Sequence, residues 1–337
     1  MKRLITLASV GLWSLGLVTL AGTAAADYPE RDITNVVVWS AGGGTDVSNR
    51  IISAEMEQFL PVRINVTNKP GGVAGSIGMS YVHGRPADGY TIVGLSESCV
   101  TAGVQGGWDQ KMDVWYPFIV GGSPDLISVT ADAPYQNLKE LVEAARSNPG
   151  SIKAAASGAG SIHHLNLLAL MKGTGAQMSF IPYAGSAPAQ NAAMTGEVSV
   201  VVTSLAEQQQ LLKGGKLRAL GMLVPDAFTV DGVGDIPSAF TAYPELSEHL
   251  PISQAIGMAV RNDVPDEVKT VLSDAFTKAL ATDKVKQWAA DNYYVLSGKT
   301  GDAASEEFAR LESLFAWTLH DLGAAKLDPS TLGIAKP

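Results

Sequence analysis

The chain has 337 residues, with 24 lysines and arginines against 33 aspartates and glutamates, which gives a formal charge of −9. This acidic balance argues against a protein that binds nucleic acid or anionic membranes through a broad basic surface. The only cysteine, Cys99, cannot form an internal disulfide, so stability must come from packed apolar cores. The length is sufficient for two domains.

The first 26 residues have the order of a secretory signal peptide. Lys2 and Arg3 come first, an apolar stretch covers residues 4–20, and three alanines at 24–26 provide a cleavage position. A retained membrane anchor is the alternative, but polar residues and glycines interrupt the stretch and no basic stop-transfer cluster follows it. We therefore expect cleavage after about Ala26 and a soluble periplasmic protein with a charge of −11.

The next segment alternates strands, glycine-rich turns and helices. Residues 33–39 form an apolar, β-branched run that ends at a Ser-Ala-Gly-Gly-Gly turn. Residues 47–60 have helical spacing, and residues 62–66 indicate another strand. A strand, turn, helix and strand in this order form a βαβ unit with parallel strands. The same order recurs around a second glycine turn at residues 157–161.

The remaining pattern predicts an α/β protein with two lobes. Further strands are expected at 89–95, 119–120, 126–129, 152–156, 180–183, 198–203 and 217–223, and an apolar run covers 255–260. Further helices are expected after residue 78 and at 138–147, 162–172, 188–195, 267–282, 283–291 and 305–323. We predict that residues 27–125 and 251–337 form lobe 1, that residues 126–250 form lobe 2, and that at least two strands cross between them. Both lobes should contain mostly parallel sheets flanked by helices.

The glycine turns at residues 40–46 and 157–161 are the strongest candidates for ligand binding. In open parallel sheets, ligands lie at the carboxyl ends of strands, where loop amides and helix N-termini point outward. The two turns belong to different lobes, so each could hold one carboxylate of a small anion across the cleft. Taken singly, either could be only a tight strand-to-helix turn. Neither completes a Walker A loop or a dinucleotide motif, because lysine and the third glycine are missing.

Six motifs follow one another along the chain. They are Tyr28-Pro-x-Arg31 with the strand into Gly-Gly-Gly-Thr-Asp46, Asn68-Lys-Pro-Gly71 with Ile77-Gly78, Pro86-x-Asp-Gly-Tyr-Thr91, Gly158-x-Gly-Ser-x-x-His-Leu165, Pro182-Tyr183-x-Gly185 and Gly214-Gly-Lys-Leu-Arg-Ala219. This order resembles the TctC/Bug family, the extracytoplasmic solute receptors of tripartite tricarboxylate transporters, over essentially all of the chain after the signal peptide.

The resemblance implies a two-lobed periplasmic binding protein of the Venus-flytrap, type II-like kind. Such a protein would capture a small organic acid, a di- or tricarboxylate or an aromatic acid, and deliver it to integral membrane transporter subunits. The resemblance also implies that backbone amides, hydroxyls and waters hold the carboxylates in place of arginine.

Four departures from the family pattern leave the identity of the acid open. Trp39-Ser40-Ala41 lacks the proline of an aromatic-x-Pro turn, and the second loop, residues 71–75, is one residue longer. Ala184 stands where a lysine is usual, and we expect no acidic or amide residue near Thr203 and Ser204.

The candidate ligand-binding residues follow the ends of predicted strands. They are Trp39, Ser40, Gly43, Gly44, Thr45, Ala74, Gly75, Glu97, Ser98, Ser157, Gly158, Ser161, His164, Tyr183, Ala184, Gly185, Thr203 and Ser204. Trp39 either walls the cleft or packs in the core below the loop. Glu97 either faces the cleft, where it would repel a polyanion and favour an amine or hydroxyl, or is a solvated loop side chain.

The polar candidates of lobe 2 have alternative roles as well. Ser157 and Ser161 flank a helix start, so their hydroxyls could cap the helix and contact a ligand oxygen, and they rank above Thr203 and Ser204. His164 either shares the face of Ser161 or packs against the core. Tyr183 either donates its hydroxyl to the ligand or only packs between the lobes.

No enzyme, cofactor or metal site is expected. The chain lacks a Gly-x-Ser-x-Gly elbow, and Ser161 with His164 on one helix face lacks the opposed geometry of a triad. His163 and His164 point about 100° apart on a helix, with no partner at ligand spacing. A monomer is the simplest expectation. Two alternatives remain, a sensor input for a two-component system and, less favoured, an exported hydrolase.

Overall fold

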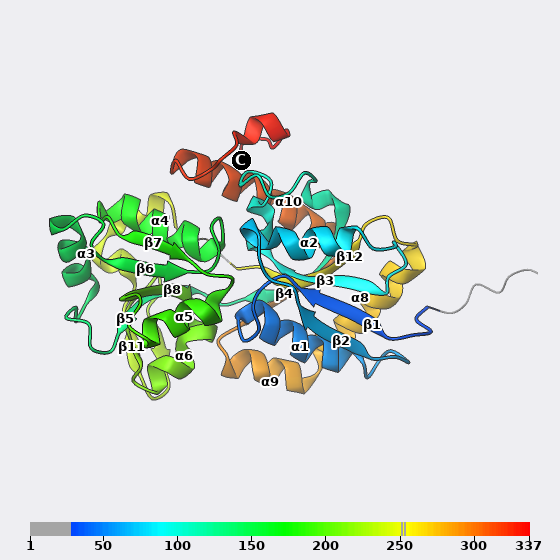
Figure 1. Ribbon diagram of the computed structural model, residues 1–337. Helices are drawn as coiled ribbons and strands as arrows, with labels where there is room; N and C mark the ends of the chain where they lie inside the picture. The colour runs from blue at the N-terminus through cyan, green and yellow to red at the C-terminus, as the bar shows by residue number, and fades with distance from the viewer. Residues whose placement is uncertain (1–27, 251, 253) are drawn as a thin grey trace, which may run out of the picture.

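The computed structural model describes residues 28–250, 252 and 254–337, and the predicted signal peptide lies outside the described residues. The chain forms two α/β bodies that lie side by side in Figure 1. We call the body around the six-stranded sheet lobe 1 and the body around the five-stranded sheet lobe 2. Within the described residues, none of the helices has the length and apolar character needed to cross a membrane.

The sheet of lobe 1 has the strand order β13-β4-β12-β3-β1-β2. Strand β1 pairs in parallel with β2 and β3, whereas β12 runs antiparallel to β3 and β4, and β13 antiparallel to β4. The strands are β1 (Ile33–Val37), β2 (Ile64–Asn68), β3 (Thr91–Ser96), β4 (Trp115–Gly122), β12 (Ile256–Arg261) and β13 (Val295–Thr300).

The sheet of lobe 2 has the order β7-β6-β8-β5-β9. Strand β6 is parallel to β7 and β8, and β5 is antiparallel to β8 and β9. The strands are β5 (Asp125–Thr130), β6 (Lys153–Ala156), β7 (Ser179–Pro182), β8 (Val200–Ser204) and β9 (Leu217–Met222), and a separate hairpin joins β10 (Phe228–Val230) to β11 (Gly234–Ile236).

The predicted α/β class with two sheets is confirmed, and both sheets are mixed because of how the chain crosses between the lobes. A strand that enters a lobe from the crossing begins where its neighbours end. Strand β12 starts at Ile256, opposite Ser96 at the end of β3, and β5 starts at Asp125, opposite Ser204 at the end of β8. The carboxyl ends of β1, β3, β6 and β8 therefore all point to the cleft between the lobes.

Helices cover both faces of each sheet. In lobe 1, α1, α8 and α9 pack on one face and α2 and α10 on the other, where Figure 1 shows α10 above α2. The helices of lobe 1 are α1 (Gly44–Met56), α2 (Ser76–His83), α8 (Asp266–Ala281), α9 (Asp283–Asp291) and α10 (Gly301–Asp321), and those of lobe 2 are α3 (Leu138–Ser147), α4 (Ile162–Thr174), α5 (Ser186–Met194), α6 (Leu205–Lys213) and α7 (Ala239–Ala242). Single 3₁₀ turns include η1 (Val73–Gly75) and η2 (Glu97–Thr101).

Four elements have no counterpart among the predicted ones, namely β13, α6, α7 and the β10–β11 hairpin. Strand β13 is an exposed edge, with Val295 75% exposed, so it lacks the apolar run that marks a buried strand. Helix α6 is rich in glutamine, and its capping box, formed by Ser204 and Glu207, is the one signal in the sequence that indicates it.

Phe276 tests the packing of α8 on the sheet of lobe 1. Its side chain is fully buried, and its ring centroid lies 5.6 Å from that of Phe118 on β4. We expect Phe276→Ala to lower the free energy of unfolding by about 3–5 kcal/mol, measured by urea denaturation followed by circular dichroism. The matched control Val295→Ala should change it by less than about 0.5 kcal/mol. A loss below about 1 kcal/mol for Phe276→Ala would contradict this packing.

Candidate functional site

A cavity of about 20 Å³ lies between the lobes, at the edge where the strands of both sheets end. Lobe 1 and the crossing strand contribute Trp39, Gly43, Gly44, Thr45, Ser96, Glu97, Ser98, Gln254 and Ile256, and lobe 2 contributes Ser157, His163, Gly185, Ser186 and Glu207. A space of this size holds about one water molecule. The two lobes are therefore closed on each other.

Four helices begin at this cavity. Gly44 and Ser186 are the first residues of α1 and α5, His163 is the second residue of α4, and Glu207 is the third of α6. The first amides of a helix lack intrahelical partners, and each N-terminus carries about half a positive charge. The backbone alone thus makes the cavity favourable for an anion. Of the described residues, no lysine or arginine lines it.

Several contacts hold the lobes together around the cavity. The amide and hydroxyl of Ser40 donate to the carbonyl oxygen of Ala184 at 3.1 and 2.8 Å. The amide of Ile162, the first of α4, donates to Ser98 Oγ at 3.0 Å. In each contact a main-chain group of lobe 2 meets a side chain or amide of lobe 1.

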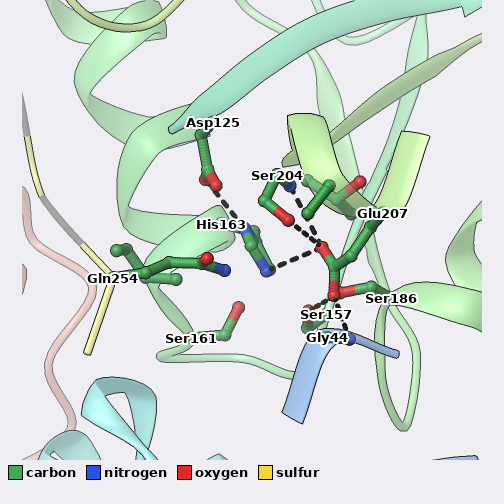
Figure 2. Close-up of polar contacts among 12 residues, drawn as sticks. Gly44, Asp125, Ser157, Ser161, His163, Ser186, Ser204, Glu207 and Gln254 are labelled. Carbon is green, nitrogen blue, oxygen red and sulfur yellow. Dashed lines mark hydrogen bonds and ion pairs between the residues drawn. The ribbon is translucent and has the colours of Figure 1, made fainter. Parts of the chain in front are cut away.

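Glu207 extends from lobe 2 to the N-terminus of α1 in lobe 1 (Figure 2). Its Oε1 accepts a hydrogen bond from the Gly44 amide at 2.7 Å. Its Oε2 accepts from the amide and hydroxyl of Ser204 at 3.0 and 2.9 Å, which completes the capping box of α6. The expectation of no acidic residue near Thr203 and Ser204 is therefore wrong, because the capping box places a carboxylate one helical turn beyond them.

His163 is the central cation of the site. Its Nδ1 lies 2.7 Å from Asp125 Oδ2 and its Nε2 lies 3.5 Å from Glu207 Oε2, as Figure 2 shows. Burial by itself lowers the pKa of His163, but the Asp125 and Glu207 carboxylates outweigh it and raise the pKa to about 9. The ring is thus an imidazolium at neutral pH. In the sequence, nothing indicates that Asp125 and His163 would meet.

Glu97 lies at the floor of the cavity with only 1% of its surface exposed. Its Oε2 accepts from the amide of Ala255 at 2.7 Å and its Oε1 from the hydroxyl of Ser98 at 2.8 Å. Burial raises the pKa of Glu97. The structure therefore places this side chain at the cleft and not on a solvated loop.

Trp39 combines the two roles considered for it. The side chain is 7% exposed and packs in the core of lobe 1, yet its ring also lines the cavity. Its Nε1 donates to Ser96 Oγ at 3.3 Å, which fixes the ring at the end of β3.

The structure brings eight of the predicted ligand-binding residues to the cavity, namely Trp39, Gly43, Gly44, Thr45, Glu97, Ser98, Ser157 and Gly185. The other ten, which are Ser40, Ala74, Gly75, Gly158, Ser161, His164, Tyr183, Ala184, Thr203 and Ser204, lie outside its lining. The pattern misses Ser96, His163, Ser186, Glu207, Gln254 and Ile256. Of these, Ser186 could have been found, since it directly follows Gly185 at the start of α5.

Residues outside the lining have structural contacts that account for them. Ser161 caps α4 by accepting a hydrogen bond from the amide of His164 at 3.2 Å. The ring of His164 stacks on Phe180 with centroids 3.9 Å apart, and burial lowers its pKa to about 4. Thr203 Oγ1 accepts from the side-chain amide of Gln190 at 3.1 Å. These contacts hold the loops that border the cavity.

The second loop, residues 71–75, packs closely against lobe 1. Ala74 and Gly75 lie in η1, where both take a positive φ, and Gly75 packs against Val38 with no room for a Cβ. In the part of the chain that the structure describes, no group of His, Cys, Asp and Glu side chains is arranged to hold a metal ion.

Two α/β lobes joined by crossing strands and closed over a cavity that faces several helix N-termini define the class of two-lobed solute-binding proteins. Residues 49–310 match the model of the TctC family, described as the tripartite tricarboxylate transporter family receptor, and the chain belongs to this family. It is a family of solute receptors and not of enzymes.

A relative over most of the chain agrees with this assignment, and solved structures share the fold. A Cupriavidus necator protein, described as a UPF0065 protein in the gbd 5′ region, is 27% identical over 93% of this chain and 94% of its own. The periplasmic binding protein BugD has the same fold, with a TM-score of 0.81, 24% identity and coverage of 89% of this chain and 100% of BugD. MatC from Rhodopseudomonas palustris with bound malate has a TM-score of 0.79 and 21% identity, with 87% and 100% covered.

The His163–Asp125 pair predicts a pH dependence. The folded-state pKa of about 9 exceeds the unfolded value near 6.5, so the pair stabilises the protein fully below about pH 6.5 and loses this effect as pH rises through 9. In NMR titrations the His163 ring should titrate near pH 9. Asp125→Asn should bring the pKa of His163 below 7, whereas Asp274→Asn, on the exposed side of α8, should leave it unchanged. A wild-type pKa of His163 below 7 would contradict the ion pair.

Proposed function

We propose that this protein is a periplasmic receptor that binds a small organic acid between its lobes and delivers it to the membrane subunits of a tripartite tricarboxylate-type transporter. The observation that carries the proposal is the convergence of four helix N-termini on one cavity between the lobes. Membership of the TctC family and the malate bound to MatC point to the same class of ligand.

The closed cavity of about 20 Å³ is too small for such an acid, so the ligand has to enter while the lobes are apart. One carboxylate would then bind the first amides of α1, near Gly44 and Thr45, and a second group would contact Ser157 and Ser186 in lobe 2. Closure brings both sets of donors to the ligand at once, and binding therefore stabilises the closed form by mass action.

A thermal-shift screen tests the ligand class. A carboxylate at about 100 times its dissociation constant should add about 2.7 kcal/mol to the free energy of unfolding and raise the melting temperature by several degrees. The panel would include mono-, di- and tricarboxylates and aromatic acids, with the matching alcohols or amides as controls. If none of these acids shifts the melting temperature, the proposed ligand class is wrong.

Two serines near the start of α4, Ser157 and Ser161, allow ligand contact to be distinguished from helix capping. Ser157 lines the cavity and pairs with Ser186 Oγ at 3.0 Å, whereas Ser161 only caps the helix. Ser157→Ala should weaken binding of the best acid about 2- to 12-fold, the equivalent of one hydrogen bond, with little loss of stability. Ser161→Ala should cost about 1 kcal/mol of stability and leave affinity nearly unchanged. Calorimetry measures the affinity of each variant and urea denaturation its stability. If Ser161→Ala weakens binding and Ser157→Ala does not, Ser157 is not the ligand contact.

Deleting the gene and measuring uptake and gene induction distinguishes a role in transport from a role in signalling. Loss of uptake of the bound acid supports delivery to a transporter. Unchanged uptake with altered gene induction would instead favour a sensor input for a two-component system.

A further inference from the structure

The carboxylate of Glu207 stands where a bound acid would place its own carboxylate. Glu207 Oε1 is 2.7 Å from the amide of Gly44, the first amide of α1, and only 6% of the Glu207 side chain is exposed. Gly44 itself leaves no space beside this contact, since an added Cβ would lie 3.0 Å from Glu207 Oε1 and 2.9 Å from Tyr294 Oη. An acid and Glu207 therefore cannot occupy this position together.

Capping of α6 does not explain the contact with Gly44. The capping box needs a single oxygen of Glu207, and Oε2 fills that role by accepting from the amide and hydroxyl of Ser204. The same oxygen faces His163, which Asp125 orients from the other side. Oε1 is thus held in place but not used within lobe 2, and its partner comes from lobe 1.

The opposite helix shows a matching arrangement. The first amide of α4, on Ile162, donates to the Ser98 hydroxyl of lobe 1 at 3.0 Å. The first amide of each of these two helices is therefore bound by a side chain from the opposite lobe. The remaining cavity of about 20 Å³ is far below the roughly 300 Å³ at the lower end of ligand sites. The lobes therefore make their closing contacts with no ligand between them.

We propose that Glu207 is an internal competitor for the ligand, which closes the empty receptor by occupying the carboxylate position of α1 and has to be displaced by the incoming acid. The displacement of Glu207 by an acid rests on the proposed function, whereas the closure of the empty receptor does not. Because only open molecules bind, the apparent affinity falls in proportion to the open fraction. Glu207 thereby restricts binding to acids that hold the α1 terminus better than its own carboxylate does.

Small-angle X-ray scattering of the ligand-free full-length protein tests the closure. The wild-type protein should have the radius of gyration of the closed form, and Glu207→Ala should have a larger one. Glu207→Gln, which keeps the shape but not the charge, should lie between them and serves if the alanine variant folds poorly. Ser204→Ala removes a capping hydrogen bond but keeps the Gly44 contact, so it should remain closed. Equal radii for the wild type and both Glu207 variants would overturn the proposal.

Calorimetry with malate, succinate, citrate and benzoate tests the competition. If the closed form exceeds nine tenths of the ligand-free wild type, Glu207→Ala should bind the best of these acids at least about tenfold more tightly. Ser204→Ala should stay within about twofold of the wild type. Weaker binding by Glu207→Ala would overturn the competitor role and make Glu207 a ligand contact. Failure of every variant to bind any acid would refute the proposed function, while the scattering result would still decide the closure.

Discussion

The structure depends on the way the chain crosses between its two lobes. Strands β5 and β12 enter their sheets from the crossing, so each begins where its neighbours end, at Asp125 and Ile256. This constraint makes both sheets mixed and directs the carboxyl ends of β1, β3, β6 and β8 to the cleft. The helices that follow those strands then begin at the cleft as well. The convergence of helix N-termini on one cavity is thus a consequence of topology, and it needs no basic side chain.

A cavity made positive by backbone groups raises the question of what balances it when no ligand is bound. Here the balance comes from within, through the Glu207 carboxylate, which is bound to the first amide of α1, and the Asp125 carboxylate beside His163. Buried charges are tolerated only where they are paired or hydrogen-bonded, and each of these is. The polar lining is consequently a connected network, and a change at one member alters the protonation or orientation of the next.

The sequence predicts the parts of this site that depend on local interactions and misses those that depend on contacts between distant segments. The glycine turns at residues 40–46 and 157–161 are local signals, and they correctly place Gly44 and Ser157 at the cavity. Glu207 was missed because α6 lacks a clear apolar period, although its capping box is visible. The meeting of His163 with Asp125 joins segments 38 residues apart and depends on how α4 lies against β5. Edge strand β13 was missed because its side chains are exposed and carry no burial pattern.

Three of the contacts between the lobes share a property that bears on how the protein can evolve. One partner is a main-chain group in each case: the carbonyl of Ala184 for Ser40, the amide of Ile162 for Ser98, and the amide of Gly44 for Glu207. Substitution at position 184 or 162 would leave that main-chain group in place. Closure therefore depends on one side chain in each contact, Ser40, Ser98 or Glu207, while the main-chain partner is inherited with the fold. A substitution at one of these three positions can change how readily the lobes close without rebuilding the scaffold.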